Sequence, residues 1–145
     1  MKIRPVLVLS VLMLCIAPFA AAQTRVQPPA LINQGLLAYA QNGLGTALQL
    51  WLQNSLLDRT TLLKGELAAL KYADANYGAF ESGEVMHTVA LTPRVTRVYL
   101  VLYYERAPLW AWFDIYRTRN GAEVISDIYF SAKVDVILPS ELRTQ

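Results

Sequence analysis

The spacing of apolar side chains divides the chain into two halves. Between Leu31 and Gly78 these side chains recur every three or four positions, which is the period of an amphipathic helix. Glycine, asparagine and capping residues interrupt this pattern twice. We therefore predict three helices: the first ends at Asn42-Gly43, the second carries Leu44, Leu48, Trp51 and Leu52 on one face, and the third runs from Asp58 or Thr60 to Gly78.

Beyond Ser82 the period falls to two, which is typical of strands with one buried face. The pattern predicts four strands, over residues 84–92, 95–106, 109–119 and 122–133. Pro93-Arg94, Pro108 and Asn120-Gly121 separate them, and Asn-Gly favours a two-residue type I′ hairpin turn. Helices followed by a meander predict the α+β class, with three N-terminal helices packed on a four-stranded antiparallel sheet.

The turn lengths also predict which residues lie opposite one another. A two-residue turn at Asn120-Gly121 places Phe113 opposite Ile128, Trp112 opposite Tyr129 and Asp114 opposite Asp127. A turn at Arg106-Ala107 places Val101 opposite Trp112 and Tyr99 opposite Asp114, and a turn at Pro93-Arg94 places His87 opposite Leu100. A slip of one residue would exchange the two faces of the sheet.

These registers give the sheet two unlike faces. The apolar face carries Val85, His87, Val89, Leu91, Val98, Leu100, Leu102, Phe113, Ile115, Val124, Ile128 and Phe130. The aromatic face carries Met86, Arg97, Tyr99, Val101, Tyr103, Trp110, Trp112, Asp114, Tyr116, Ile125, Asp127 and Tyr129. Three helices can cover the apolar face, and little of the chain remains to cover the aromatic face.

A contiguous exposed aromatic set is typical of an interaction surface, and tyrosine, tryptophan and arginine are the residues enriched at interface hot spots. We therefore expect the aromatic face to meet a second subunit, through Tyr99, Tyr103, Trp110, Trp112, Tyr116, Tyr129 and Arg97. The alternative is a solvated sheet that its cross-strand aromatic pairs stabilise.

The first 22 residues have the layout of a secretory leader. Lys2 and Arg4 precede an apolar run, and a stretch of small residues ends at Ala22. The run is too short to span a bilayer; a buried N-terminal helix is the alternative. We expect cleavage near Ala22 and one exported domain over residues 23–145, periplasmic or secreted, with no membrane span.

Removal of this leader changes the charge and the available chemistry. The sequence holds 13 basic and 11 acidic side chains, and Lys2 and Arg4 leave with the leader. The nearly neutral remainder gives no electrostatic reason to expect a nucleic-acid partner. Cys15, the one cysteine, also leaves, which excludes disulfides, thiolate metal sites and cysteine nucleophiles.

A helical half is followed by the run RVYLVLYYERAPLWAWFDIYR, a hairpin turn and the run VISDIYFSAKVDVILP. This series resembles small exported bacterial proteins of the nuclear transport factor 2-like (cystatin-like) superfamily, over nearly all of the exported chain. The resemblance implies a curved sheet wrapped around helices, a possible cavity on the concave side and dimerisation through the convex side. The apolar face would then be concave and the aromatic face convex. That superfamily includes enzymes and binding modules, so no activity follows from it.

The predicted pair of Asp114 and Asp127 is the sharpest chemical signal. Two carboxylates about 5 Å apart repel each other and need a shared proton, a cation or water between them. One interpretation is an acid/base pair, and another is an oxygen-ligand metal site. The alternative is that Arg97, or Arg117 from a partner chain, neutralises the two carboxylates. Because no third ligand accompanies them, we expect no metal.

His87 is the only histidine, and the predicted register places it on the apolar face. It could act as a general base in a concave pocket; a buried, hydrogen-bonded structural histidine is the alternative. A pocket on this side would be lined by His87, Leu100, Phe113 and Tyr77. No HExxH, CxxC or glycine-rich phosphate loop occurs, and we expect no cofactor.

Three functional hypotheses follow. The first is a non-enzymatic exported homodimer, joined through the aromatic face, with a small apolar ligand on the concave side. The second is a cofactor-free lyase or isomerase for a small hydrophobic molecule, with His87, Asp114 or Asp127 as the base. The third is an adaptor domain that docks a different envelope protein on the aromatic face.

Overall fold

The computed structural model describes residues 29–57 and 63–143. The predicted leader and the predicted start of the third helix at Asp58 or Thr60 lie outside these residues. Three helices come first, α1 (Ala30–Asn42), α2 (Leu44–Trp51) and α3 (Leu63–Asn76). The break between α1 and α2 falls at Gly43, whose φ of 81° is a left-handed conformation that favours glycine.

Four strands follow the helices and form one antiparallel sheet. They are β1 (Phe80–Thr92), β2 (Val95–Tyr104), β3 (Pro108–Arg117) and β4 (Glu123–Ser131), and they lie in the order β1-β2-β3-β4. A one-turn helix, α4 (Val134–Ile137), and a short 3₁₀ helix, η1 (Ser140–Leu142), follow the sheet. The predicted α+β class, with three helices before a four-stranded meander, is confirmed.

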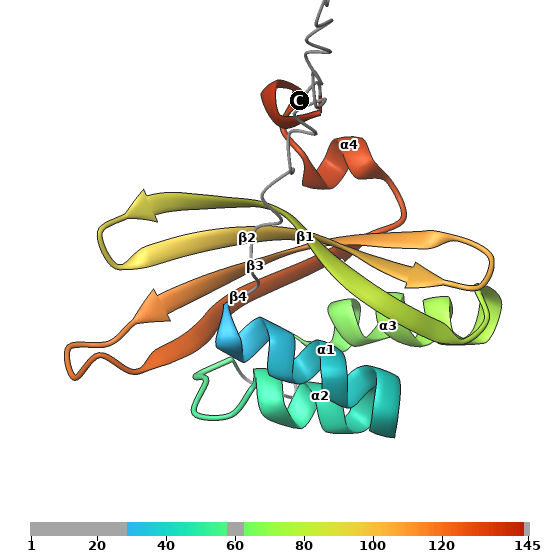
Figure 1. Ribbon diagram of the computed structural model, residues 1–145, viewed down its shortest axis with the longest axis horizontal. Coiled ribbons are helices and arrows are strands. Elements are labelled where there is room, and N and C mark those ends of the chain that lie inside the picture. The colour runs from blue at the N-terminus through green and yellow to red at the C-terminus, as the bar shows by residue number, and fades with distance from the viewer. Residues whose placement is uncertain (1–28, 58–62, 144–145) are drawn as a thin grey trace, which may run out of the picture.

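The three longer helices lie on one side of the sheet and α4 lies on the other (Figure 1). The apolar face packs against the helices and forms the main core with them. Trp51 is central to this core: it is fully buried, and its ring meets that of Phe113 edge-on at 5.1 Å. Gly35 allows this packing, because a Cβ atom at that position would lie 1.8 Å from the Trp51 ring nitrogen.

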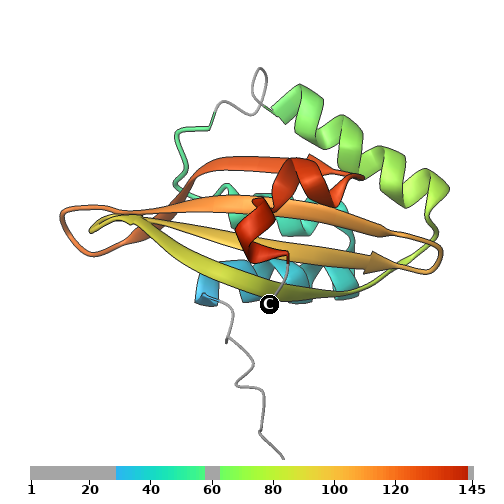
Figure 2. The ribbon, with the colours of Figure 1, turned by 90° about the horizontal axis from the view of Figure 1, so that it is seen from above.

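The aromatic face is also covered at its centre, by residues that follow β4. We call residues 134–142, with α4 and η1, the strap. Seen from above, the strap lies across the middle of the sheet (Figure 2). Ile137 and Leu138 pack on Tyr99 there, and all three side chains are buried. The expectation that little of the chain remains to cover this face is therefore wrong.

The β3–β4 hairpin confirms three predicted pairs through a different turn. Phe113 lies opposite Ile128, Trp112 opposite Tyr129 and Asp114 opposite Asp127, as predicted. The two-residue type I′ turn is wrong: the Thr118 N–H donates to the Ala122 carbonyl at 2.8 Å, which leaves a three-residue loop in which Gly121 has a φ of 86°. A bulge between Asp114 and Ile115 adds one residue on β4 and restores the predicted register.

Because of that bulge, Ile125 and Val124 lie on the faces of the sheet opposite to those predicted. Ile125 lies opposite Ile115 and belongs to the main core, although the sequence placed it on the aromatic face. Val124 lies opposite Tyr116, so it is on the aromatic face instead.

The β2–β3 register differs from the prediction by two residues. Tyr99 lies opposite Trp112 and Val101 opposite Trp110, because the turn centres on Glu105-Arg106. An even shift keeps every side chain on its predicted face. Arg97, rather than Tyr99, therefore lies opposite Asp114.

Strand β1 departs most from the prediction. Its pairing with β2 shifts between Ala90 and Thr92 and again between Val85 and His87. Each shift inserts one residue and reverses the alternation of faces. His87 lies opposite Tyr99, and Val89 lies opposite Arg97, so both are on the aromatic face and their assignment to the apolar face is wrong.

The outer edge of β4 is protected by hydrogen bonds from the helical half. The Ser55 hydroxyl donates to the Ile125 carbonyl at 2.6 Å, and the Phe130 N–H donates to the Glu66 carboxylate at 2.7 Å. Figure 2 shows α3, which carries Glu66, along this edge. Backbone groups that are satisfied in this way are less available to pair with a strand of another chain, so we do not expect the β4 edge to form an interface.

Candidate functional site

The strap divides the aromatic face into a covered centre and two open sides. Along β3, the strap packs on Trp110 and Trp112, and both rings remain half-buried. Beyond Trp110 lies Tyr103, which is 38% exposed and donates its hydroxyl to Glu84 at 3.0 Å. Beyond Trp112, towards the β3–β4 loop, Asp114 is buried and Tyr116 is half-buried. All seven predicted interface residues lie on this face, but Tyr99 lies beneath the strap.

The side that carries Tyr129 is a group of neighbouring side chains that we call the Tyr129 flank: Arg97, Trp112, Asp114, Tyr116 and Tyr129. The Arg97 guanidinium carbon lies 4.0 Å from the Trp112 ring centre, and the Trp112 ring stacks on Tyr129 at 5.9 Å and 20°. These contacts join β2, β3 and β4 across the face. Tyr129 is 37% exposed and forms the outer end of the stack. Cation–π and aromatic pairs of this kind hold large side chains in fixed positions while leaving ring surface exposed.

Arg97 neutralises Asp114 within the chain. Its Nε and Nη2 atoms donate to the two carboxylate oxygens at 2.7 Å each, and Asp114 is a buried charged residue. The hydrogen bond to Asp114 raises the pKa of Arg97 above its usual range, despite some burial, so the guanidinium stays charged. Asp127 is exposed, and its Oδ1 accepts from the Ile128 N–H at 2.9 Å. The geometry therefore agrees with neutralisation by Arg97 and provides no shared-proton contact between the two carboxylates.

His87 holds the end of the strap. Its Nε2 lies 3.1 Å from the Leu142 carbonyl oxygen, on the aromatic face. Leu100 and Phe113 lie on the other side of the sheet and are fully buried in the main core. The structure thus does not bring His87 together with Leu100 and Phe113 as one pocket wall.

The space expected for a ligand on the apolar face is occupied around Phe113 by Trp51. Tyr77, the fourth predicted pocket residue, is half-buried at the end of α3, and its ring meets Tyr104 edge-on at 6.1 Å. Sequence spacing alone did not predict how far Trp51 reaches into the sheet, because that depth depends on the missing side chain at Gly35.

A buried hydroxyl network was missed by the sequence analysis. The Tyr39 hydroxyl donates to Asp74 at 2.7 Å and lies 2.8 Å from the Tyr104 hydroxyl. Burial raises the pKa of Tyr104 to about 12 and raises that of Tyr39 further, so both phenols are neutral at physiological pH. Tyr39 also stacks on Phe80 at 4.1 Å. The network links α1, α3 and β2, and its long sequence separations leave no local signal.

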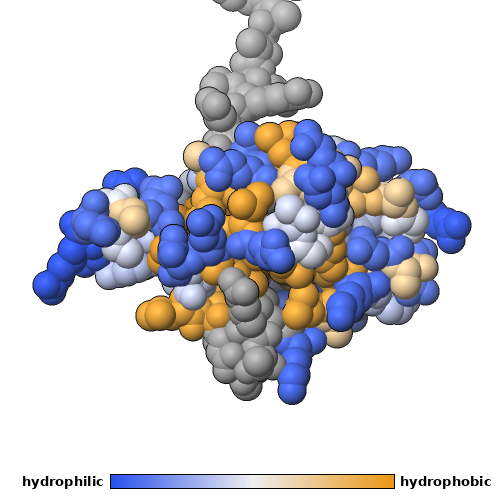
Figure 3. Space-filling model, turned by 90° about the horizontal axis from the view of Figure 1, so that it is seen from below, coloured by the Kyte–Doolittle hydropathy of each residue, from blue (hydrophilic) through white to orange (hydrophobic). Residues whose placement is uncertain are grey.

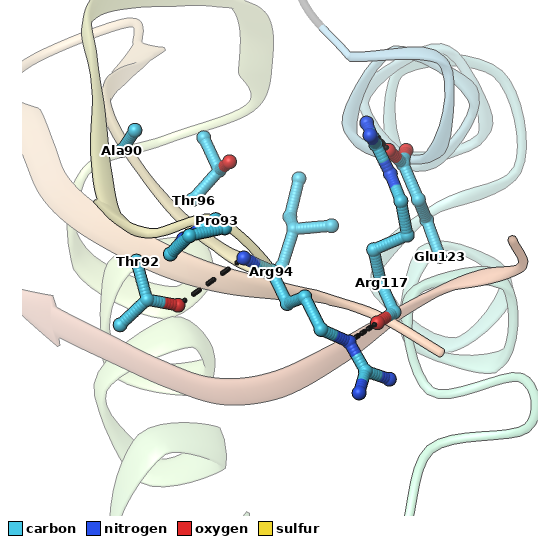
Figure 4. Close-up of a pocket in the computed structure, with 8 residues that line it drawn as sticks. Ala90, Thr92, Pro93, Arg94, Thr96, Arg117 and Glu123 are labelled. Carbon is cyan, nitrogen blue, oxygen red and sulfur yellow. Dashed lines mark hydrogen bonds and ion pairs between the residues drawn. The ribbon is translucent and has the colours of Figure 1, made fainter. Parts of the chain in front are cut away.

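A small hollow lies at the end of the apolar face, beside the β1–β2 turn (Figure 4). Its volume is about 140 Å³, below the range of roughly 300–1,000 Å³ typical of ligand pockets. Arg117 pairs with Glu123 at 3.0 Å at its rim. The Arg94 Nε donates to the Arg117 carbonyl, and its guanidinium carbon lies 4.8 Å from the Tyr116 ring. Arg117 therefore has an anionic partner, whereas the Arg94 Nη2 atom is buried without a hydrogen-bond partner among the described residues.

Comparison with known proteins adds no relative. No family model, curated protein or solved structure matches this chain.

Within residues 29–57 and 63–143, no three histidine, cysteine, aspartate or glutamate side chains gather closely enough to hold a metal ion. None of the helices in the same ranges is long and apolar enough to cross a membrane. The Tyr129 flank combines an exposed tyrosine, fixed geometry and residue types suited to recognition.

Proposed function

We propose that this chain is an exported, non-enzymatic protein that self-associates through the aromatic face of its sheet. The observation that carries the proposal is the Tyr129 flank: an ordered stack of Tyr129, Trp112 and Arg97 left open beside the strap. Aromatic residues and arginine are the side chains that contribute most to binding energy at protein interfaces.

The electrostatics of the flank favour burial by a partner. Covering an unpaired charge costs several kcal/mol. Here the Asp114 carboxylate already accepts two hydrogen bonds from Arg97, so a second subunit can cover both without leaving either charge unpaired. The exposed Asp127 at the rim can stay hydrated.

Export and family membership belong to the same proposal. The pattern of the first 22 residues supports a leader and a periplasmic or secreted location. The order of three helices and a four-stranded meander supports a relationship to the nuclear transport factor 2-like superfamily, some of whose members dimerise through the convex side of the sheet. An envelope protein docked on the same surface is the competing partner.

The enzymatic hypothesis receives no support from the geometry. His87 contacts the strap carbonyl and Asp114 contacts Arg97, so two of the three proposed bases are engaged within the chain. A small apolar ligand on the concave side loses its predicted wall, since Leu100 and Phe113 are packed core.

A set of single substitutions tests the proposal by sedimentation velocity. Tyr129→Ser should weaken self-association at least about tenfold, as for loss of one hot-spot side chain. Tyr72→Ser is the matched control, because Tyr72 is an exposed tyrosine on α3, in the helical layer.

Leu37→Ser tests the competing surface. Viewed from the helix side, hydrophobic residues gather around the middle of the molecule and hydrophilic ones at its two ends (Figure 3). Leu37, on α1, is 53% exposed. Dissociation by Leu37→Ser, with Tyr129→Ser unchanged, would assign the interface to the helices and contradict the proposal. A wild-type chain that sediments as a monomer would also contradict it.

A further inference from the structure

The strap and the surface beneath it form a packing unit separate from the main core. Ile137, Leu138 and Tyr99 are its buried members. Met86, Val89, Trp110, Trp112, Val134 and Leu142 surround them. The helices pack on the opposite face of the sheet. The strap can therefore leave its position without opening the main core.

The link between β4 and the strap is short and solvent-exposed. Only Ala132 and Lys133 separate the last strand residue from α4, and both are exposed. Lys133 has an extended backbone, with φ −109° and ψ 120°. An extended two-residue link can redirect the segment that follows it with a change in few dihedral angles, which is the usual form of a hinge.

A vacated surface would not be stable in a single chain. Removal of the strap would expose Tyr99, which is 6% exposed beneath it, together with more of the Trp110 and Trp112 rings. A contiguous exposed apolar area of this kind is typical of a surface that binds another chain. The segment known to fit it is the strap itself, and the strap of a second copy would form the same contacts, so exchange between two copies requires no new complementarity.

We propose that in the dimer each strap lies on the aromatic face of the other copy. This inference rests on the proposed function and specifies how the two copies join. The strap leaves β4 at Ser131, the residue opposite Trp110, beside the Tyr129 flank. Exchange would therefore bring the second copy onto this flank, and His87 of each copy would contact Leu142 of the other.

Crosslinking between differently tagged copies tests the exchange. One copy carries His87→Cys and the other Leu142→Cys, positions that the 3.1 Å contact places together. Both also carry Cys15→Ser, which removes the one native cysteine. The two are co-expressed, purified through both tags in succession, treated with a short thiol crosslinker and separated on a denaturing gel. We expect a crosslinked species that contains both tags.

Three controls make every outcome informative. Each single-cysteine chain alone should give no more than a background band, and His87→Cys with Leu37→Cys, on the helical layer, should give no mixed species. A chain with both His87→Cys and Leu142→Cys reports the unexchanged arrangement as an internal crosslink. Light scattering on the same samples gives the mass. A dimer with internal crosslinks alone would overturn the exchange and leave the proposed function standing, whereas a monomer would overturn both.

Discussion

The two faces of one sheet are closed in different ways. The apolar face is covered by three helices and shares with them a continuous core that includes Trp51, Leu100 and Phe113, all fully buried. The aromatic face is covered by a strap whose buried contribution is Ile137 and Leu138. Burial stabilises in proportion to apolar area, so the first face secures the fold, while the second leaves ordered aromatic surface available for recognition.

The side chains suit these two roles. Aliphatic residues and phenylalanine gain by complete removal from water. Tyrosine, tryptophan and arginine have apolar bodies and polar ends, and they are stable half-buried, as Trp112 and Arg97 are here. Substitutions on the apolar face should therefore lower the free energy of global unfolding. Substitutions on the aromatic face should instead open the strap locally or weaken association.

The largest effect is expected for Trp51→Ala. Removal of this buried ring leaves a cavity beside Phe113 and Tyr39, and we expect a loss of about 3–5 kcal/mol in the free energy of unfolding. Denaturant unfolding followed by circular dichroism measures it. A loss below about 1 kcal/mol would show that the apolar face does not carry the stability of the fold.

The next largest effect on stability is expected for Asp114→Asn, and it should distinguish Asp114 from Asp127, which lies opposite it on β4. Asp114→Asn removes one charge from the Arg97 pair and should cost about 1.5–3 kcal/mol, in the range for hydrogen bonds to charged groups. Asp127→Asn is the matched control and should change stability by less than about 0.5 kcal/mol, because Asp127 is exposed. Equal losses at both positions would instead indicate that the two carboxylates act as a coupled pair.

A smaller effect is expected for Leu138→Ala in the strap. The strap can detach while the main core stays closed, so we expect the free energy of unfolding to fall by at most about 2 kcal/mol. Hydrogen exchange should accelerate at the amides of Val136 and Leu138, whose bonds stay within the strap region, with β2 amides unchanged. Acceleration throughout β2 would show that the strap and the main core unfold together.

The smallest effect concerns Glu66 at the β4 edge. Burial raises the pKa of Glu66, so the folded state binds this proton more tightly than the unfolded chain does. The associated stability is present below the ordinary value of 4.5 and is lost as the pH rises through the folded-state pKa. Glu66→Gln keeps an acceptor for the Phe130 N–H and removes this titration. Relative to the wild type, the variant should gain stability between pH 4 and pH 7; a constant difference would contradict the assignment.

The sequence predicted the elements and much of the aromatic face correctly. Alternation alone placed Arg97, Trp112 and Tyr129 together, and the pairing of Trp112 with Tyr129 is confirmed. That success depended on two offsets that cancel, a longer loop at Gly121 and a bulge near Asp114. The sequence therefore predicted these pairs correctly, although the predicted two-residue turn is wrong and a bulge on β4 compensates for it.

Bulges and long-range contacts account for what the sequence did not show. The shifts in β1 place His87 on the aromatic face, and no residue type in that strand predicts where the pairing shifts. The strap helix spans four residues, too few for a helical period to be recognised. Tyr39 and Tyr104 are 65 positions apart, so their hydrogen bond follows from tertiary packing alone.

The most direct test of the account is the molar mass of the purified wild-type chain in solution. Light scattering at micromolar concentration should give twice the mass of one chain, since the aromatic face remains partly open in the monomer. A mass of one chain across the micromolar range would show that the strap alone satisfies this face and would contradict its role as an interface.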